Sequence, residues 1–183
     1  MKILFVVPKI KSLFGDKGLT VQPHIGIAYL AAFLKSQGIE VSVFDDGIEK
    51  STDKIFTVID SFKPDIIGIT IFSYSYGAAY ELVKKIKTYS RIPLVLGGPH
   101  VGAVRKEALE DTGVNFAVKF EGEYTLIELL EELHKESPDF NKIEGLLWCS
   151  NGKIAENPDR PFIKDLDSLP FPDYDIFGIE LYT

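Results

Sequence analysis

Three short segments of this 183-residue chain carry side chains suited to holding a small molecule. The first, at 72–77, is rich in hydroxyl and aromatic groups. Ser73 and Tyr74 can hydrogen-bond a polar, uncharged ligand edge while aromatic rings pack against it. The alternative is that the serines of this segment only cap the helix that follows. The chemistry indicated is non-covalent recognition rather than catalysis.

The second segment, Gly97-Gly98-Pro99-His100, combines paired glycines with a histidine. Paired glycines let a bulky ligand approach the backbone, or they simply allow a turn with positive φ. His100 could bind a metal, donate a hydrogen bond or serve as a turn residue. A lone histidine is more often not a metal ligand.

The third segment, Glu121-Gly122-Glu123, precedes a helical pattern. Acidic side chains stabilise the N-terminus of a helix, and they also repel phosphate. The chain has neither G-x-G-x-x-G after its first strand nor G-x-x-x-x-G-K-S/T anywhere. Asp45 and Asp46 resemble a ribose-binding or phospho-acceptor pair, but the glycine fingerprint that would support ribose binding is missing. The pattern therefore disfavours a nucleotide-phosphate or flavin site.

No catalytic set emerges from the sequence. G-x-S-x-G and H-E-x-x-H are both absent. His24, His100 and His134 are too scattered to predict a metal cluster. The single cysteine, Cys149, excludes an internal disulfide and a cysteine-rich zinc or iron–sulfur site within these residues.

The three segments follow strands of a predicted α/β sheet. Alternating strand and helix patterns predict a five-stranded parallel sheet with helices on both faces. By analogy we expect the Rossmann-like, flavodoxin-like strand order 2-1-3-4-5, whose ligands bind beyond the carboxyl ends of the strands. The predicted strands are 3–7, 40–44, 65–71, 94–96 and 116–119, and the apolar faces of the predicted helices lie at 27–34, 55–62, 79–86, 104–110 and 126–133.

The remaining segments are a long first loop and a distinct tail. The predicted loop 8–24 is longer than most connections in such folds, which is typical of a functional loop. In the tail, Asn151-Gly152 between two apolar runs predicts a β-hairpin, and a proline-punctuated linker follows. We therefore expect a Rossmann-like domain at 1–141, and a hairpin and linker at 142–183 leading to another domain or a partner.

Composition narrows the possible partners and location. Lys and Arg total 20 against 27 Asp and Glu, a net charge of −7, so we expect no nucleic-acid binding. No apolar run reaches the length of a membrane span, and the first residues do not form a secretory signal. We expect a cytoplasmic protein without a membrane partner.

Five segments, taken in order, carry a family resemblance. They resemble the N-terminal cobalamin-binding domain of cobalamin-dependent radical S-adenosylmethionine (radical-SAM) proteins, and the resemblance covers nearly the whole chain. The segments are Pro23-x-x-Gly26-Ile27-x-Tyr29-Leu30-Ala31-Ala32-x-Leu34-Lys35-x-x-Gly38-x-x-Val41, Pro64-Asp65-Ile66-Ile67-Gly68-Ile69-Thr70, Leu96-Gly97-Gly98-Pro99-His100, Glu121-Gly122-Glu123, and Asp165-Leu166-Asp167-Ser168-Leu169-Pro170-Phe171-Pro172.

The resemblance implies a module that holds cobalamin over the carboxyl ends of the strands and faces a radical-SAM barrel later in the chain. In the family that barrel begins with C-x-x-x-C-x-x-C, whereas these residues contain only Cys149. S-adenosylmethionine and the iron–sulfur cluster would therefore belong to a domain absent here. The module would not be catalytic alone, and its parent would be a methyltransferase-like enzyme.

The resemblance also assigns residues to the cofactor. It places Ser73 and Tyr74 near the corrin edge, the segment 97–100 below it, and the segment 121–123 at the last loop of the rim. The D-x-H-x-x-G signature is missing, which implies base-off binding without a histidine ligand, with the nucleotide tail beside the sheet. Family members often carry Gly-Glu-Gly-Glu where Phe120 here replaces the first glycine. The alternative function is a cofactor-free interaction or substrate-presenting domain that retains the fold.

Overall fold

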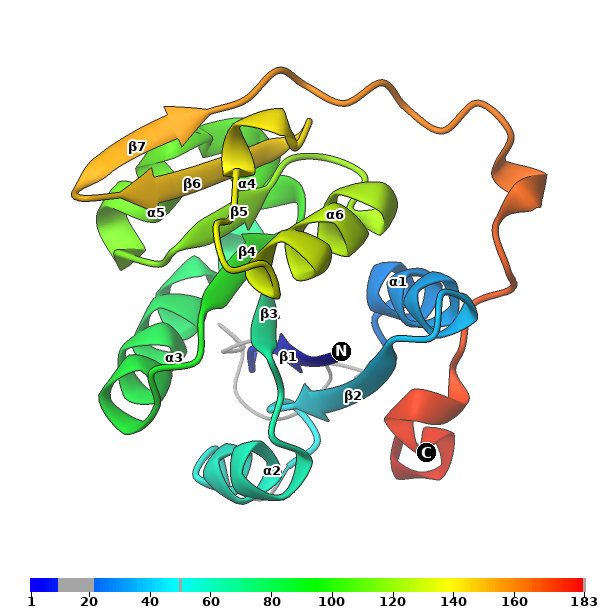
Figure 1. Cartoon of the computed structure of the whole chain (residues 1–183). Coiled ribbons are helices and arrows are strands. Elements are labelled where there is room, and N and C mark those ends of the chain that lie inside the picture. The colour runs from blue at the N-terminus through cyan, green and yellow to red at the C-terminus, as the bar shows by residue number, and fades with distance from the viewer. Residues whose placement is uncertain (10–21, 50, 183) are drawn as a thin grey trace.

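The computed structural model describes residues 1–9, 22–49 and 51–182 of the chain. They form a seven-stranded sheet with helices on both faces (Figure 1). The strands are β1 (Lys2–Val7), β2 (Glu40–Asp45), β3 (Ile66–Thr70), β4 (Leu94–Gly97), β5 (Phe116–Val118), β6 (Leu146–Ser150) and β7 (Lys153–Glu156). The helices are α1 (Ile25–Ser36), α2 (Lys54–Phe62), α3 (Tyr76–Tyr89), α4 (Pro99–Val104), α5 (Lys106–Thr112) and α6 (Glu123–Leu133).

The strand order β2-β1-β3-β4-β5-β6-β7 contains the predicted parallel order of the first five strands. The predicted hairpin forms at Asn151 and Gly152, both of which have positive φ (49° and 75°), as a tight two-residue hairpin turn requires. No partner strand was predicted for this hairpin, and in the structure β6 pairs antiparallel with β5 and extends the same sheet. The sheet therefore has seven strands rather than five, since the open edge of β5 offers unpaired backbone groups.

Two apolar clusters lie on opposite faces of the sheet. Along β1, Leu4 and Val6 join the cluster covered by α2, α3 and α5, whereas Ile3 and Phe5 join the cluster covered by α1 and α6. This alternation follows from the two-residue period of a strand, and burial on both faces explains the continuous apolar run.

The predicted helix at 104–110 is wrong in detail. Two short helices, α4 and α5, meet at Arg105, whose φ of 53° and ψ of −116° interrupt helical geometry. The break turns the Arg105 guanidinium toward Glu156 and Asp159, with which it forms ion pairs. Contacts distant in the sequence thus override the local helical pattern.

The tail beyond β7 is extended and returns to the opposite side of the molecule, beside α1 and β2 (Figure 1). The amide of Asp173 donates to the carbonyl of Ala28 at 3.0 Å, and Phe177 is buried in the cluster of α1 and α6. The hydroxyl of Tyr182 donates to the carboxylate of Asp45 at 2.7 Å. The tail therefore packs along the domain, and its role as a linker to another domain stays a prediction.

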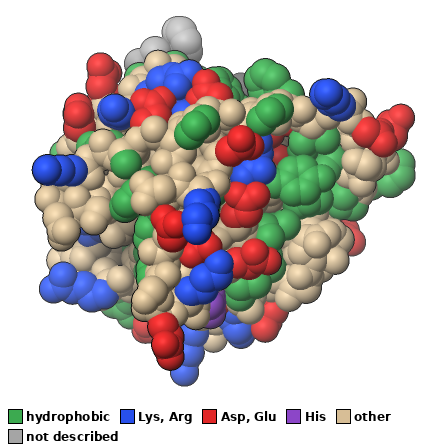
Figure 2. All heavy atoms as spheres, turned by 45° about the horizontal axis from the view of Figure 1, so that its top comes forward, with side chains coloured by type: hydrophobic (Ala, Val, Ile, Leu, Met, Phe, Trp, Pro, Cys, Tyr) green, Lys and Arg blue, Asp and Glu red, His purple; other side chains and the backbone are tan. Residues whose placement is uncertain are grey.

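The charge distribution on the surface and the lengths of the helices can be compared with the predictions about nucleic acid and membranes. On the side shown in Figure 2, acidic and basic side chains are interspersed, and hydrophobic side chains gather between and beside them. That face has no concentrated positive patch of the kind that contacts a nucleic-acid backbone. Within the described residues, no helix is long and apolar enough to cross a membrane. The cytoplasmic location stays a prediction.

Candidate functional site

An open cavity of about 370 Å³ lies at the carboxyl ends of β3 and β4, on the side covered by α1 and α6. Its walls come from β1, β3, β4 and β5 and from the first turns of α1 and α6. The strands β3 and β4 end level with one another because Thr70 pairs with Gly97. The cavity thus occupies the edge at which open α/β sheets bind ligands.

The floor of the cavity is apolar and depends on a close approach between two strands. A Cβ atom at Gly68 on β3 would lie 2.9 Å from the ring of Phe5 on β1, so only glycine leaves room for that ring. Both residues line the cavity, together with Leu30 and Leu126 from the covering helices. An apolar floor of this kind suits a flat, uncharged group.

The adjacent glycines Gly97 and Gly98 have different reasons to be glycine. At Gly98, φ is 98°, and a Cβ atom would lie 2.7 Å from the carbonyl oxygen of Ile71. The turn with positive φ therefore accounts for Gly98. At Gly97 a Cβ atom would meet nothing within 4 Å among the described residues, and the residue lines the cavity. Its missing side chain leaves room for a ligand.

His24 caps α1 at the cavity wall. Its Nδ1 accepts a hydrogen bond from the amide of Ile27 at 3.2 Å, so the proton lies on Nε2, which donates to Oγ1 of Thr70 at 3.2 Å. Burial lowers the pKa of His24, which favours this neutral form. This role was not predicted from the sequence, although a histidine directly before an apolar helical pattern occupies the capping position.

The acidic segment at the start of α6 contributes a buried carboxyl. Glu123 is only 8% exposed and lines the cavity, and its Oε2 has no hydrogen-bond partner. Burial, with a smaller contribution from Glu121, raises the pKa of Glu123. Glu121 also lines the cavity, but its Oε2 accepts a hydrogen bond from the amide of Ile163 in the tail at 2.7 Å.

The predicted site residues divide into two groups. Ser73 and His100 lie outside the cavity wall, where Oγ and Nδ1 are 3.1 Å apart. Tyr74 is exposed and stacks on Phe72, which does line the cavity. Of the predicted site residues, those that line the cavity are Gly97, Gly98, Pro99, Glu121, Gly122 and Glu123. All nine lie at or just beyond the carboxyl ends of β3, β4 and β5, and their roles toward a cofactor stay predictions.

Helix capping by serine, metal binding and the long first loop were also considered in the sequence-based predictions for this rim. Ser75 stands at the N-cap of α3 but makes no side-chain hydrogen bond to that helix, because its hydroxyl instead accepts from the preceding amide of Phe72 at 3.2 Å. Across the described ranges 1–9, 22–49 and 51–182, no group of three or more His, Cys, Asp or Glu side chains could hold a metal ion. Most of the loop predicted at 8–24 lies outside the described residues, namely 10–21.

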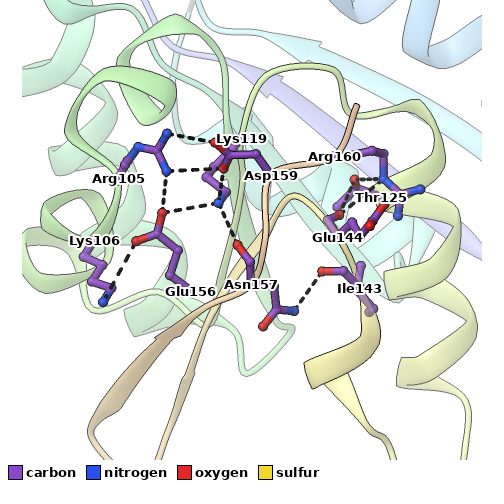
Figure 3. Close-up of polar contacts among 10 residues, drawn as sticks. All are labelled: Arg105, Lys106, Lys119, Thr125, Ile143, Glu144, Glu156, Asn157, Asp159 and Arg160. Carbon is purple, nitrogen blue, oxygen red and sulfur yellow. Dashed lines mark hydrogen bonds and ion pairs between the residues drawn. The ribbon is translucent and has the colours of Figure 1, made fainter. Parts of the chain in front are cut away.

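Sequence reasoning missed a charged cluster that holds the tail at this rim (Figure 3). Lys119, only 1% exposed, pairs with Glu156 at 3.3 Å and with Asp159, and it donates to the carbonyl of Asn157 at 2.8 Å. Arg105 binds the same two carboxylates, at 2.6 Å and 3.0 Å. From the sequence, Lys119 was predicted only as the end of a strand, because the partners that stabilise its buried charge lie far along the chain.

The cluster places the tail against the rim loop that contains the acidic segment. Phe162 of the tail packs edge-on against Phe120, with ring centroids 5.7 Å apart. Phe120 itself has a φ of 58°, in the left-handed region that favours glycine. Phe120 stands where the cobalamin-binding family that the sequence resembles often has glycine. Its backbone therefore has a conformation typical of glycine, although the residue is a phenylalanine.

Comparisons with known sequences agree with this geometry. A family model described as the B12 binding domain matches residues 13–130. The uncharacterized methyltransferase PH0819 of Pyrococcus horikoshii is 34% identical over 185 residues, covering 100% of this chain and 40% of that protein. Cytidylyl-2-hydroxyethylphosphonate methyltransferase of Streptomyces wedmorensis is 26% identical over 222 residues, covering 99% and 41%. The chain thus spans about two fifths of the length of these curated relatives.

Solved structures share the fold. The radical-SAM enzyme OxsB, with aqua-cobalamin and S-adenosylmethionine bound, matches 99% of this chain and 25% of its own with a TM-score of 0.81 at 20% identity. The radical-SAM methyltransferase TsrM from Kitasatospora setae, with cobalamin and a 4Fe-4S cluster bound, matches 93% and 31% with a TM-score of 0.68 at 21% identity. In both enzymes the similar region is a minor part of the chain.

Proposed function

We propose that this chain, which belongs to the B12-binding domain family, holds cobalamin base-off, with the corrin over the strand ends and the lower base in the cavity. The observation that carries the proposal is the apolar cavity at the carboxyl edge of the sheet. Bound cobalamin would supply a cobalt centre able to carry a methyl group. The described residues would bind the cofactor and keep water from its base.

The histidines near the rim support the base-off form. Both ring nitrogens of His24 are engaged within the protein, one as the cap of α1 and the other with Thr70. The Nδ1 of His100 lies beside the hydroxyl of Ser73 rather than in the cavity. The cavity is open rather than filled by the protein's own side chains, which argues against the cofactor-free alternative.

The proposal also concerns a second domain with which this chain would act. We propose that the chain acts with a radical-SAM domain that holds S-adenosylmethionine and an iron–sulfur cluster, and that it is not catalytic alone. Supporting this, OxsB and TsrM are radical-SAM enzymes, of which the chain covers 25% and 31%. Within the proposal, residues 1–141 bind cobalamin, and residues 142–183 form the hairpin and the linker.

A titration of the 183-residue chain with hydroxocobalamin tests the binding. We expect the absorption spectrum of the corrin to change to the base-off form and saturate with protein concentration. Gly97→Val should weaken binding strongly, because the added side chain enters the cavity where no described atom lies within 4 Å of its Cβ.

The matched control is Gly77→Val on α3. Gly77 also has no atom within 4 Å of an added Cβ, but it does not line the cavity. This variant should bind as the unsubstituted chain does. Absence of a spectral change and of binding heat at high micromolar protein would refute the proposed function.

A further inference from the structure

Glu123 stands out within the cavity because it is polar, buried and incompletely paired. It begins α6, where the amides of Gly122 and Glu123 itself partly stabilise its charge. Its Oε2 is nevertheless buried without a hydrogen-bond partner. A buried polar atom without a partner is energetically unfavourable, so a ligand group that hydrogen-bonds to it gains free energy on binding.

The charge around the cavity determines the form of this carboxyl. Among the described residues that line the cavity, the ionisable side chains are His24, Glu121 and Glu123, and none is a lysine or arginine. Burial raises the pKa of Glu123, and Glu121 raises it further. His24 is kept neutral by burial and by its cap to α1. An apolar site without a cation therefore favours the protonated acid, which is able to donate a hydrogen bond.

The same charges limit what the cavity accepts. A phosphate would meet two carboxyl groups and no cation among the described lining residues, which disfavours an anionic group there. A flat, uncharged aromatic ring matches the apolar floor formed by Phe5, Leu30 and Leu126. Glu123 adds one directional contact to that apolar surface.

We propose that the Glu123 carboxylic acid donates a hydrogen bond to a ring nitrogen of the base that enters the cavity, and so makes the site selective for corrinoids with a nitrogen-containing lower base. The inference rests on the proposed function and adds a recognition residue and a ligand preference to it. The phosphate and sugar that link the base to the corrin would stay outside the apolar cavity.

Corrinoids with different lower ends test this role by titration of the 183-residue chain. Cobalamin carries a benzimidazole base, a phenolic cobamide carries a ring without nitrogen, and cobinamide lacks the nucleotide. We expect Glu123→Met to weaken cobalamin binding about tenfold, the ratio that one typical hydrogen bond supplies. The same substitution should leave the affinities for cobinamide and for the phenolic cobamide unchanged.

The conservative variant separates recognition from packing. Glu123→Gln should bind cobalamin nearly as the unsubstituted chain does, because an amide N–H can donate to the same nitrogen. The affinity of the unsubstituted chain for cobalamin should fall as the pH rises through the raised pKa of Glu123, whereas the affinity of the Gln variant should not. Cobinamide binding by each variant reports that the site is folded.

The outcomes distinguish the two proposals. If neither cobalamin nor cobinamide binds the unsubstituted chain, the proposed function fails and this inference fails with it. If both bind and Glu123→Met has unchanged affinity for cobalamin, the inference alone is overturned. Equal losses for cobalamin and cobinamide would likewise overturn it, because they would show a structural rather than a base-recognising role.

Discussion

The adjacent glycines at the end of β4 allow a sharp test of the structural reasoning. We expect Gly98→Ala to destabilise the fold and Gly97→Ala to leave its stability nearly unchanged. At Gly98 the φ of 98° and ψ of 174° lie in a region open almost only to glycine. The backbone passes close to Ile71 there, since the carbonyl of Ile71 accepts from the amide of His100 at 3.2 Å.

The size of the effect follows from that geometry. Conformational strain of this kind costs about 1–3 kcal/mol. The Cβ added by Gly98→Ala would also lie 2.7 Å from the carbonyl oxygen and 3.0 Å from the amide nitrogen of Ile71, and backbone atoms at a strand end cannot move aside easily. We therefore expect a loss of about 3 kcal/mol in the free energy of unfolding for Gly98→Ala, and less than about 0.5 kcal/mol for Gly97→Ala.

Urea denaturation provides the measurement. The chain has a single tryptophan, Trp148 on β6, which is half-buried and donates from its ring nitrogen to Asn157 at 3.3 Å. Its fluorescence and far-ultraviolet circular dichroism should give coincident transitions if unfolding is two-state. A loss below about 1 kcal/mol for Gly98→Ala, or equal losses for the two variants, would refute the assignment of one glycine to the turn and the other to the cavity.

Other substitutions test the charged cluster and the rim. Lys119→Met should lower the free energy of unfolding by about 3 kcal/mol in urea denaturation, whereas Lys84→Met, in an exposed ion pair, should change it by less than about 0.5 kcal/mol; equal effects would contradict the burial argument. Arg105, with Lys119, lowers the pKa of Asp159, so stability from this pairing is present above the ordinary carboxyl pKa and is lost as the pH falls through the lowered value. The acid dependence of the urea midpoint should therefore be shallower in Lys119→Met, and an unchanged slope would count against the pairing. Phe120→Gly should be more stable than Phe120→Ala by about 1 kcal/mol, because alanine retains the strain of a positive φ; equal urea midpoints would contradict it.

The parallel sheet followed from local patterns read together, whereas the order of its strands was expected only by analogy with flavodoxin-like folds. Alternating strands and helices allow few topologies, and the buried strand at 66–70 is apolar along most of its length, so its place inside the sheet was predictable. The hairpin at Asn151-Gly152 was equally local. Its pairing with β5 was not predicted, because nothing near the hairpin indicates which sheet edge it will join.

The features that were not predicted from the sequence depend on contacts between distant parts of the chain. Arg105 breaks a helix in favour of Glu156 and Asp159, which lie 51 and 54 residues further along the chain. Lys119 is buried by the same distant carboxylates. Charge pairs of this kind leave no periodic signal in the sequence, so patterns of neighbouring residues cannot reveal them.

The candidate site was predictable as a location more than as a set of contacts. Loops that follow parallel strands meet at one edge, which brought the segments 97–100 and 121–123 together as expected. The sequence left open whether the glycines serve a turn or a ligand, and the structure assigns one role to Gly98 and leaves space at Gly97. The unpaired oxygen of Glu123 depends on the packing of α6 and could not be inferred from residue type.

The return of the tail to α1 and β2 has a consequence for biosynthesis. Phe177 and Tyr182 leave the ribosome well after the partners they pack against, since Tyr182 and Asp45 are 137 positions apart. The part of the apolar surface of α1 that Phe177 covers therefore stays exposed to solvent until the tail has been synthesised. Because contacts of long sequence separation slow folding, we expect the packing of the tail to be a slow step.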